Sequence, residues 1–335
     1  MSFQPVRWGV LGVAKIANER VIPPLAGSPM VSVRAIASRQ LPKAESAAKR
    51  HAIERAYGSY EQLIGDPDIE AVYIPLPNHM HVEWTLKAAT AGKHVLCEKP
   101  IALSGAEVET LAEAAAKHGV CIMEGFMVFS HPLWKAAREL VRSGRIGTVH
   151  GFHMSFASPN YDPANIRNRA EVAGGSLTDK GCYAVALARF LFDREPERVI
   201  AAMDIDLDFK VDRLTTALME FDGAQASFNC ASQLAAYQHL VIMGERGRLE
   251  ADIPVNLPDD GLTRLRMVTG SMLAEQVAET MTFEPCNQYR LMFEAFSQAV
   301  RSGSALPVSL PFSAGNARAV EALFRSSASG RWERP

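Results

Sequence analysis

The stretch VRWGVLGVAKIA (Val6–Ala17) decides the fold of this chain. Its apolar first half predicts a buried strand over Val6–Leu11, and a helix-compatible stretch follows it directly. Between the two lies a turn of the type G-x-G-x-x-A, with Gly12, Ala14 and Ala17 at its small positions. Small residues there let backbone N–H groups and a helix N-terminus approach a pyrophosphate. The alternative is a tight strand-to-helix turn without a ligand, because Ala14 carries a methyl group where a second glycine is usual. The predicted cofactor contacts in this turn are Gly12, Val13, Ala14, Lys15 and Ile16.

The same alternation of strand and helix continues to about Glu124. Apolar runs that are continuous rather than alternating predict strands covered on both faces, and they lie at Val31–Ala37, Ala71–Ile74, His94–Cys97 and Val120–Met123. The predicted helices are Ala14–Ala26, Pro42–His51, Tyr60–Ile64, His79–Ala91 and Ser104–His118. Repeated β-α-β units indicate a doubly wound parallel sheet, the Rossmann type of α/β domain.

Beyond a connecting helix at His131–Ser143, the pattern changes to well-separated strands. These are predicted at Thr148–Phe156, Val199–Ile205, Thr215–Phe221, Ala224–Cys230, Tyr237–Met243 and Gly247–Ala251. Turns such as Asp222-Gly223 indicate hairpins and hence an antiparallel sheet. Helices are expected at Gly175–Phe192, Gln288–Ser302 and Phe312–Ser327. We therefore expect a dinucleotide-binding domain with the doubly wound sheet over 1–125 and a connecting helix in 126–147. A second domain with an antiparallel sheet follows over 148–311, and a C-terminal helix and tail over 312–335.

Length and charge exclude several classes of protein. A chain of 335 residues favours two domains, and 48% hydrophobic with 21% charged residues is a globular composition. The net charge of -2 disfavours nucleic acid and anionic membranes as partners. Five scattered cysteines without a C-x-x-C pair suit a reducing compartment, and no metal site is predicted. The segment Met1–Arg7 lacks the pattern of a secretory signal, and no apolar stretch reaches about 18 residues. We expect a soluble, cytoplasmic protein.

The end of the second strand indicates which dinucleotide binds. An acidic residue there would bind the ribose 2′-hydroxyl of NAD, but this strand ends in Ser38-Arg39, with Lys43 shortly after. A hydroxyl and a guanidinium suit the 2′-phosphate of NADP. The cofactor is therefore predicted to be NADP, with NAD less favoured, although Arg39 and Lys43 could also be solvated surface charges.

Two further motifs carry groups suited to proton transfer. Glu98-Lys99-Pro100 follows a strand at its carboxyl end, where open α/β sheets place their ligand crevice, so Lys99 is a candidate proton handler or positive clamp. The alternative is a turn with an ion pair. The segment GGSLTDKGCY (174–183) opens a helix on which Asp179 and Tyr183 are four residues apart and share a face. Gly181 between them would let a ligand come close. A phenol near a cationic Lys could take a proton from an alcohol.

The combination of these motifs resembles the Gfo/Idh/MocA family of oxidoreductases. The glycine turn, Pro77–His81, the E-K-P motif and the G-G-x-L-x-D-x-G-x-Y motif carry the resemblance. It is nearest to the branch with dimeric dihydrodiol dehydrogenases, NADP-dependent xylose dehydrogenases and glucose–fructose oxidoreductase. Further matching segments spread over almost the whole chain: Ala56–Glu61, Gly92–Cys97, Phe126-Met127, His131-Pro132, Val211-Asp212 and Asn287–Tyr289.

The resemblance implies a Rossmann domain (1–125) followed by an α+β domain with a large open, mainly antiparallel sheet (148–311), and it places the active site between them. It implies that Lys99 contacts the cofactor ribose and the substrate, that Tyr183 is the acid/base group and that Asp179 lines the site. Further expected cofactor contacts are Ser38, Arg39, Lys43, Pro75, Leu76, Asn78, His81 and Glu98. Weaker substrate-binding candidates are His131, Phe156, Asn160, Arg167, Arg169 and Tyr289. Lys180, where many relatives carry an apolar residue, either adds a charge near the crevice or points to solvent.

These observations predict an NADP-dependent dehydrogenase of a sugar or a cyclic diol, a small polyol substrate. Hydride would pass from the carbinol carbon to nicotinamide C4 while Tyr183 and Lys99 handle the hydroxyl proton. An aldose–aldose oxidoreductase or a keto-sugar reductase that retains NADP is an alternative, as is a non-catalytic dinucleotide-binding sensor. An open antiparallel sheet exposes a face, so a homodimer or homotetramer through the second domain is expected.

Overall fold

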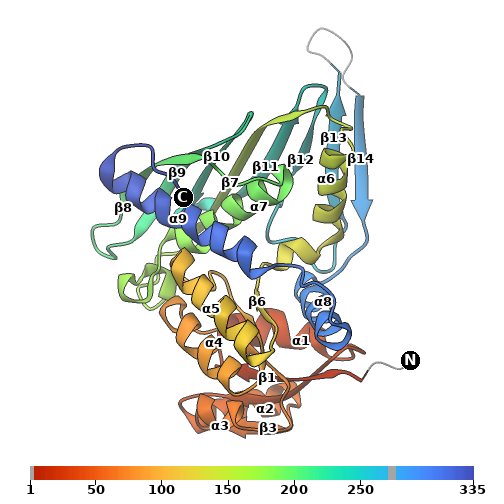
Figure 1. Ribbon diagram of the computed structural model, residues 1–335, viewed down its shortest axis with the longest axis vertical. Helices are drawn as coiled ribbons and strands as arrows, with labels where there is room; N and C mark the ends of the chain where they lie inside the picture. The colour runs from red at the N-terminus through yellow and green to blue at the C-terminus, as the bar shows by residue number, and fades with distance from the viewer. Residues whose placement is uncertain (1–3, 271–276) are drawn as a thin grey trace. The chain divides into compact units, whose positions relative to one another are not determined.

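The computed structural model describes residues 4–270 and 277–335 (Figure 1). The described chain forms two compact units. The first comprises the chain up to Ser130 together with Asn287–Ala314, and the second comprises His131–Cys286 and Gly315–Pro335.

This division differs from the predicted boundary at Thr148. The helix α6 (Pro132–Arg142) lies in the second unit, where the Trp134 indole donates a 3.0 Å hydrogen bond to the carbonyl of Pro254. The helix α8 (Gln288–Ser302) returns to the first unit, where the Trp8 indole donates to Ser297 at 3.2 Å and packs on Phe293 with ring centroids 4.7 Å apart. The packing of buried aromatic side chains, which sequence order does not reveal, sets these boundaries.

The first unit is built on a six-stranded sheet in the order β3-β2-β1-β4-β5-β6, with every pair parallel. The predicted doubly wound sheet is confirmed. Its strands are β1 (Val6–Leu11), β2 (Val31–Ala37), β3 (Arg55–Tyr57), β4 (Ala71–Ile74), β5 (His94–Cys97) and β6 (Ile122–Glu124). The helical segments are η1 (Ala17–Val21), α1 (Ile22–Leu25), α2 (Leu41–His51), α3 (Tyr60–Ile64), η2 (Asn78–Met80), α4 (His81–Thr90), α5 (Gly105–His118), η3 (Met127–Ser130) and α8.

The strand ends place the predicted motifs along one edge of this sheet. All four residues of β4 are buried, as expected for a strand covered on both faces. Because the strands are parallel, their carboxyl ends share an edge, and Gly12, Ser38, Pro75 and Glu98 each follow directly after a strand. In open α/β sheets this edge is where ligands bind.

The second unit contains an eight-stranded sheet in the order β14-β13-β12-β11-β7-β10-β9-β8. Only β7 and β10 pair in parallel among these described strands, and the rest pair antiparallel, so the predicted mainly antiparallel sheet is confirmed. The strands are β7 (Val149–Pro159), β8 (Arg198–Ile205), β9 (Asp212–Phe221), β10 (Ala224–Ala231), β11 (Gln233–Gly244), β12 (Gly247–Ala251), β13 (Thr263–Thr269) and β14 (Val277–Phe283). Its helical segments are α6, η4 (Ile166–Asn168), η5 (Ala170–Val172), η6 (Leu177–Gly181), α7 (Cys182–Phe192) and most of α9 (Leu310–Ser329).

Helices cover one face of this sheet (Figure 1). Phe192 at the end of α7 packs on Phe152 of β7 and on Phe221 of β9, with ring centroids 6.4 and 4.9 Å apart. Side chains that point to the opposite face are more exposed, including Tyr237 at 57% and Met243 at 43%.

Candidate active site

The glycine turn has the backbone geometry that its sequence predicts. Gly12 has φ +112°, a region that favours glycine, and a Cβ there would lie 3.0 Å from Cδ2 of Leu76. Its N–H donates to the carbonyl of Ala37 at 2.9 Å, which fixes the turn against the end of β2. The helix that follows includes the π-helical turn η1, a rare local form often found at functional sites. The first N–H groups of this helix therefore face the carboxyl edge of the sheet.

Cationic side chains lie in this turn and just after β2. Arg39 and Lys43 are exposed, and Lys15 pairs only loosely with Glu19 at 3.9 Å. The Ser38 hydroxyl accepts a 3.2 Å hydrogen bond from the N–H of Gln40. The chain just after β2 carries no carboxylate, and its positive charge suits a phosphate.

The E-K-P turn is held in place by buried polar groups. The N–H of Glu98 donates to the carbonyl of Ile74 at 3.1 Å, and the Tyr73 hydroxyl donates to the Glu98 carboxylate at 2.6 Å. Burial and the Glu98 charge raise the pKa of Tyr73 well above its usual value, so this phenol stays protonated. The backbone of Ile101 donates to Glu124 at 3.0 Å on the far side of the turn. Lys99, half-buried, thus sits on a fixed backbone.

His81 lies behind this turn rather than on the surface of the site. Its imidazole is fully buried, with Nδ1 2.7 Å from the carbonyl of Pro100 and Nε2 2.7 Å from the carbonyl of Leu76. Burial lowers its pKa. The ring joins the loop after β4, which contains Pro75, Leu76 and Asn78, to the E-K-P turn. Its contribution to cofactor binding would therefore act through these two loops.

In the second unit, the two glycines at 174 and 175 allow close backbone packing. A Cβ on Gly174 would lie 2.6 Å from the carbonyl oxygens of Ile166 and Arg167. Gly175 has φ +116°, and a Cβ there would collide with the Asp212 carboxylate. The N–H of Gly175 donates to the carbonyl of Arg167 at 2.8 Å. The glycines thus bring the loop 166–169 onto the start of the next helix.

Asp212 anchors that helix. It is 2% exposed, and its Oδ2 accepts hydrogen bonds from the Ser176 hydroxyl at 2.6 Å, the Leu177 N–H at 2.8 Å and the Thr215 hydroxyl at 2.6 Å. Burial raises the pKa of this carboxyl group, against the effect of its three donors. The sequence marks Asp212 only as part of a matching segment. Its anchoring role depends on a contact across 35 residues, which no local pattern reveals.

The helix start carries a group of polar side chains around Tyr183. The Asp179 carboxylate contacts Nε of Arg167 at 2.7 Å and Nζ of Lys180 at 3.1 Å. Lys180 is 3% exposed, and its Nζ lies 5.9 Å from the centre of the Phe156 ring. It adds a buried charge beside Asp179 instead of pointing to solvent. Tyr183, 4% exposed on the first turn of α7, packs 6.4 Å from the same ring.

Gly181 has a different role from the one expected. A Cβ there would lie 2.6 Å from Cδ1 of Leu177 and 3.1 Å from Sγ of Cys230 on β10. The prediction that Gly181 lets a ligand approach is wrong, because side chains of the protein itself fill the space beside its Cα. Gly181 lets the helix pack closely against the sheet.

The remaining candidates fall in several places. Arg169 is exposed and pairs with Glu171 at 2.6 Å. The N–H of Asn160 donates to the Ser232 carbonyl at 2.7 Å. Tyr289 lies buried on α8 in the first unit.

His131 opens α6 in the second unit. Its ring is fully buried, its Nδ1 accepts a 3.1 Å hydrogen bond from the N–H of Leu133, and its Nε2 has no partner among the described residues. Burial lowers the pKa of His131 to about 4, so the imidazole is neutral at neutral pH.

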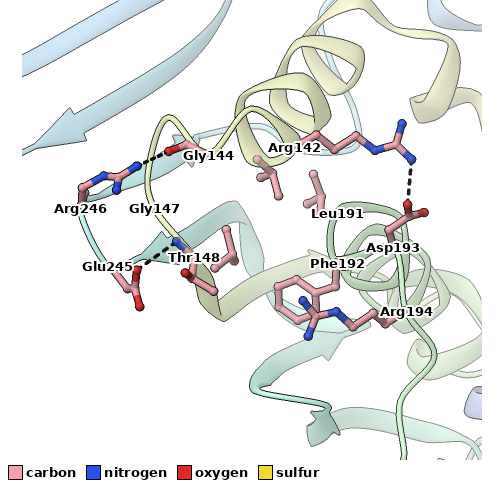
Figure 2. A pocket seen from close by; sticks show the side chains of 12 residues that line it. Arg142, Gly144, Gly147, Thr148, Leu191, Phe192, Asp193, Arg194, Glu245 and Arg246 are labelled. Atoms are coloured by element: carbon pink, nitrogen blue, oxygen red, sulfur yellow. Dashed lines mark hydrogen bonds and ion pairs between the residues drawn. The ribbon is translucent and has the colours of Figure 1, made fainter.

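A cavity of about 430 Å³ lies elsewhere in the second unit, and no predicted site residue lines it (Figure 2). The polar groups that line this cavity form hydrogen bonds and ion pairs with one another. Arg142 contacts Asp193 at 2.8 Å, Arg246 donates to the carbonyl of Gly144 at 2.6 Å, and the N–H of Thr148 donates to Glu245 at 3.3 Å. These contacts join the ends of α6 and α7 to the β11–β12 hairpin, so we assign the cavity no ligand.

Over residues 4–270 and 277–335, no helix is both long and apolar enough to cross a bilayer. The same residues contain no group of three or more His, Cys, Asp or Glu side chains suited to hold a metal ion.

Comparisons with known proteins cover both halves of the chain. Residues 6–126 match the oxidoreductase family with an NAD-binding Rossmann fold, and residues 134–250 match the Gfo/Idh/MocA C-terminal domain. The chain is 45% identical to an uncharacterized oxidoreductase of Rhizobium meliloti over 98% of both chains. It is 37% identical to a D-xylose 1-dehydrogenase (NADP(+)) of Haloferax volcanii over 96% of this chain and 98% of the other. A 3-ketoreductase from Actinomadura kijaniata, solved with NADP and TDP-benzene, has a TM-score of 0.88 at 32% identity and covers 96% of this chain and 98% of its own. The protein is therefore an enzyme of the Gfo/Idh/MocA oxidoreductase family.

Proposed function

We propose that the protein is an NADP-dependent dehydrogenase that oxidises an alcohol group of a sugar or a cyclic diol. The observation that carries this proposal is the polar group at residues 177–183. It combines a buried phenol, Tyr183, with a carboxylate, Asp179, that two cations contact. Such a group suits proton transfer to or from a hydroxyl.

The residues around the glycine turn fit the cofactor. A side chain at position 12 would press on Leu76, so only glycine leaves room beside this turn. The first N–H groups of the following helix suit a pyrophosphate. Ser38, Arg39 and Lys43 would hold the 2′-phosphate, because the end of β2 offers a hydroxyl and two cations without a carboxylate. The loop from Pro75 to Asn78 would line the nicotinamide side. When bound, NADP supplies the redox chemistry by accepting a hydride.

The protein's own groups would handle the proton and orient the substrate. In this proposal Tyr183 takes the hydroxyl proton, and the positive charge of Lys99 lowers the free energy of the resulting phenolate. Asp179 would accept a hydrogen bond from a substrate hydroxyl, and its contacts with Arg167 and Lys180 hold its carboxylate in place. Phe156 packs beside Tyr183 and restricts water.

Relatives support a sugar-like substrate. One is named a D-xylose 1-dehydrogenase, and another is named a dTDP-3,4-didehydro-2,6-dideoxy-alpha-D-glucose 3-reductase. The same residues serve both directions, since a group that accepts a proton in oxidation donates it in reduction. A keto-sugar reductase is therefore the second candidate.

The test is turnover with a panel of aldoses, cyclic diols and keto sugars, followed by absorbance at the reduced-nicotinamide band. We expect NADP reduction with at least one aldose or diol. Cofactor binding without turnover in either direction would instead favour a sensor. Cofactor retained through purification would favour an aldose–aldose oxidoreductase.

We also propose that two copies of the chain pair through the open face of the eight-stranded sheet. This face presents Tyr237 and Met243, which are about half exposed and lie six residues apart on the same side of β11. Sedimentation should give a dimer or tetramer that Tyr237→Lys weakens, and a wild-type monomer at micromolar concentration would contradict the proposal. We further propose a cytoplasmic location, because five scattered cysteines without a C-x-x-C pair suit a reducing compartment.

A further inference from the structure

A short chain of side-chain hydrogen bonds joins the glycine turn to α2. The Asn18 side chain is 9% exposed, and its Nδ2 donates to the carbonyl of Ala14 at 2.9 Å. Its Oδ1 lies 3.0 Å from Nε2 of His51, the last residue of α2. Asn18 thus connects Ala14, the second small position of the turn, to a separate helix.

The Ala14 carbonyl fixes the order of donors and acceptors in this chain. Because a carbonyl can only accept, the NH₂ group of Asn18 faces Ala14 and its amide oxygen faces His51. Nε2 of His51 therefore carries the ring proton and donates it to Oδ1. Burial and the charge of Arg50 lower the pKa of His51, so the ring is neutral at pH 7 and has one N–H to donate. Each donor in the chain faces an acceptor.

The direction of the Ala14 carbonyl decides where the next N–H points. This carbonyl also accepts a 3.1 Å hydrogen bond from the backbone N–H of Asn18, so it points into the helix of residues 15–25. A peptide group is planar and trans, so the N–H of Lys15 points the opposite way, out of the helix start. N–H groups at a helix start bind anions. A second donor on the Ala14 carbonyl therefore holds the Lys15 N–H in the direction that suits a phosphate.

The backbone by itself supports this helix start poorly. Residues Ala17–Val21 form a π-helical turn, so the regular α-helical hydrogen bonding is interrupted soon after the helix begins. Helix ends fray, and a first turn without a regular second turn behind it loses cooperative support. Asn18 and His51 supply side-chain support at this place.

We propose that Asn18 is a positioning residue, held by His51, that orients the Ala14–Lys15 peptide toward the pyrophosphate of the dinucleotide. This inference rests on the proposed binding of the pyrophosphate at this helix start. Asn18 acts through the backbone of the turn and takes no part in hydride or proton transfer. NADP and NAD share the pyrophosphate, whereas adenosine 2′-phosphate (2′-AMP) lacks it. The expected signature is therefore an equal loss of affinity for both dinucleotides and no loss for 2′-AMP.

The experiment measures the dissociation constants of NADP, NAD and 2′-AMP for the full chain by calorimetry, without any sugar substrate. Asn18→Leu keeps the approximate size of the side chain and removes both of its hydrogen bonds. It should weaken NADP and NAD by the same factor, about fivefold or more, and leave 2′-AMP unchanged. His51→Phe keeps a ring at the end of α2 and should weaken both dinucleotides by a smaller factor. In the Asn18→Leu background, His51→Phe should have no further effect.

His94→Phe is the matched control for His51→Phe. His94 is also a partly buried histidine, and its Nδ1 accepts a 2.9 Å hydrogen bond from the N–H of Cys121. It is the first residue of β5, so it lies at the amino edge of the sheet, opposite to the glycine turn. We expect this variant to bind all three ligands as the wild type does. A loss of dinucleotide affinity equal to that of His51→Phe would contradict the inference.

Several other outcomes would overturn the inference. Unchanged affinity of Asn18→Leu for NADP and NAD would mean that the backbone alone orients the turn. An equal loss of affinity for 2′-AMP would make Asn18 merely structural, because 2′-AMP binding also reports whether the variant is folded. A full effect of His51→Phe in the Asn18→Leu background would show that His51 acts by another route. A wild-type protein that binds neither dinucleotide would refute the proposed cofactor site, whereas wild-type binding that survives Asn18→Leu refutes this inference alone.

Discussion

Replacing Asp212 by Asn should loosen the helix start that carries Asp179 and Tyr183. In the native protein, one buried carboxylate oxygen accepts from Ser176, Leu177 and Thr215 at 2.6–2.8 Å. The amide oxygen of Asn can accept hydrogen bonds from the same three donors, but it carries no charge. Its NH₂ group adds two donors beside Ser176, Leu177 and Thr215, which are themselves donors.

The magnitude follows from these three contacts. Hydrogen bonds to a charged group contribute about 1.5–3 kcal/mol each and neutral ones about 0.5–1.5, so the exchange removes roughly 3 kcal/mol. A neutral amide costs less to bury than a carboxylate, and the raised pKa of Asp212 reflects that desolvation. We allow about 1 kcal/mol for this relief, which leaves a net loss of about 2 kcal/mol in the free energy of unfolding.

Thermal unfolding, with calorimetry to separate the two units, measures this loss. For a unit of this size, 2 kcal/mol corresponds to a Tm lower by roughly 4–8 °C. Asp204→Asn is the matched control, because its carboxylate pairs with Arg213 at 2.8 Å on the surface and such pairs contribute about 0.2–1 kcal/mol. A Tm for Asp212→Asn within the range of Asp204→Asn would refute the anchoring role.

Two further predictions concern the second unit. His131→Asn keeps a side-chain cap for α6 but removes a buried imidazole whose pKa lies near 4 in the folded chain, against 6.5 for the free residue. Because the unfolded chain takes up the proton first, the stability from the neutral ring is complete above pH 6.5 and is lost as pH falls toward 4, by about 3 kcal/mol in all. Urea unfolding at pH 7 and at pH 4.5 should show a smaller pH-dependent loss in the variant, and equal losses would contradict the buried, neutral ring. Gly181→Ala should lower the free energy of unfolding by about 1–2 kcal/mol. The added methyl group presses on Leu177 and Cys230, and the cost of this overpacking exceeds the gain in helix propensity. A raised Tm for this variant would mean that propensity outweighs the packing.

The parallel sheet could be predicted because its strands are continuous apolar runs. β1, β2, β4 and β5 lie where the apolar residues predicted them, since burial on both faces leaves an unmistakable pattern. β3 escaped prediction because it has only three half-buried residues at the sheet edge.

The far side of the second sheet was harder to predict. β13 alternates Arg264 and Arg266 with buried Leu265 and Met267, a period-two pattern that indicates a half-buried strand and that the sequence interpretation missed. β14 is almost wholly exposed and lacks an apolar face. β14 has no burial pattern that distinguishes it from a polar loop.

The candidate site shows a similar division. The motifs predict Lys99, Asp179 and Tyr183 as candidates for proton transfer, because Lys99 follows a strand at its carboxyl end and Asp179 and Tyr183 share a helix face. The groups that hold them were not found: Tyr73 beneath Glu98, and Asp212 beneath the helix start. Such supports depend on contacts between distant segments and on burial, which the linear sequence does not display.

The central claim is that Tyr183 and Lys99 handle the proton while the chain binds NADP. Tyr183→Phe and Lys99→Met test it most directly, by kcat with the best substrate of the panel and by the dissociation constant of NADP for each variant. We predict that kcat falls by about 10²-fold or more in each variant while NADP stays bound. Near-normal kcat in both variants would contradict the assigned roles.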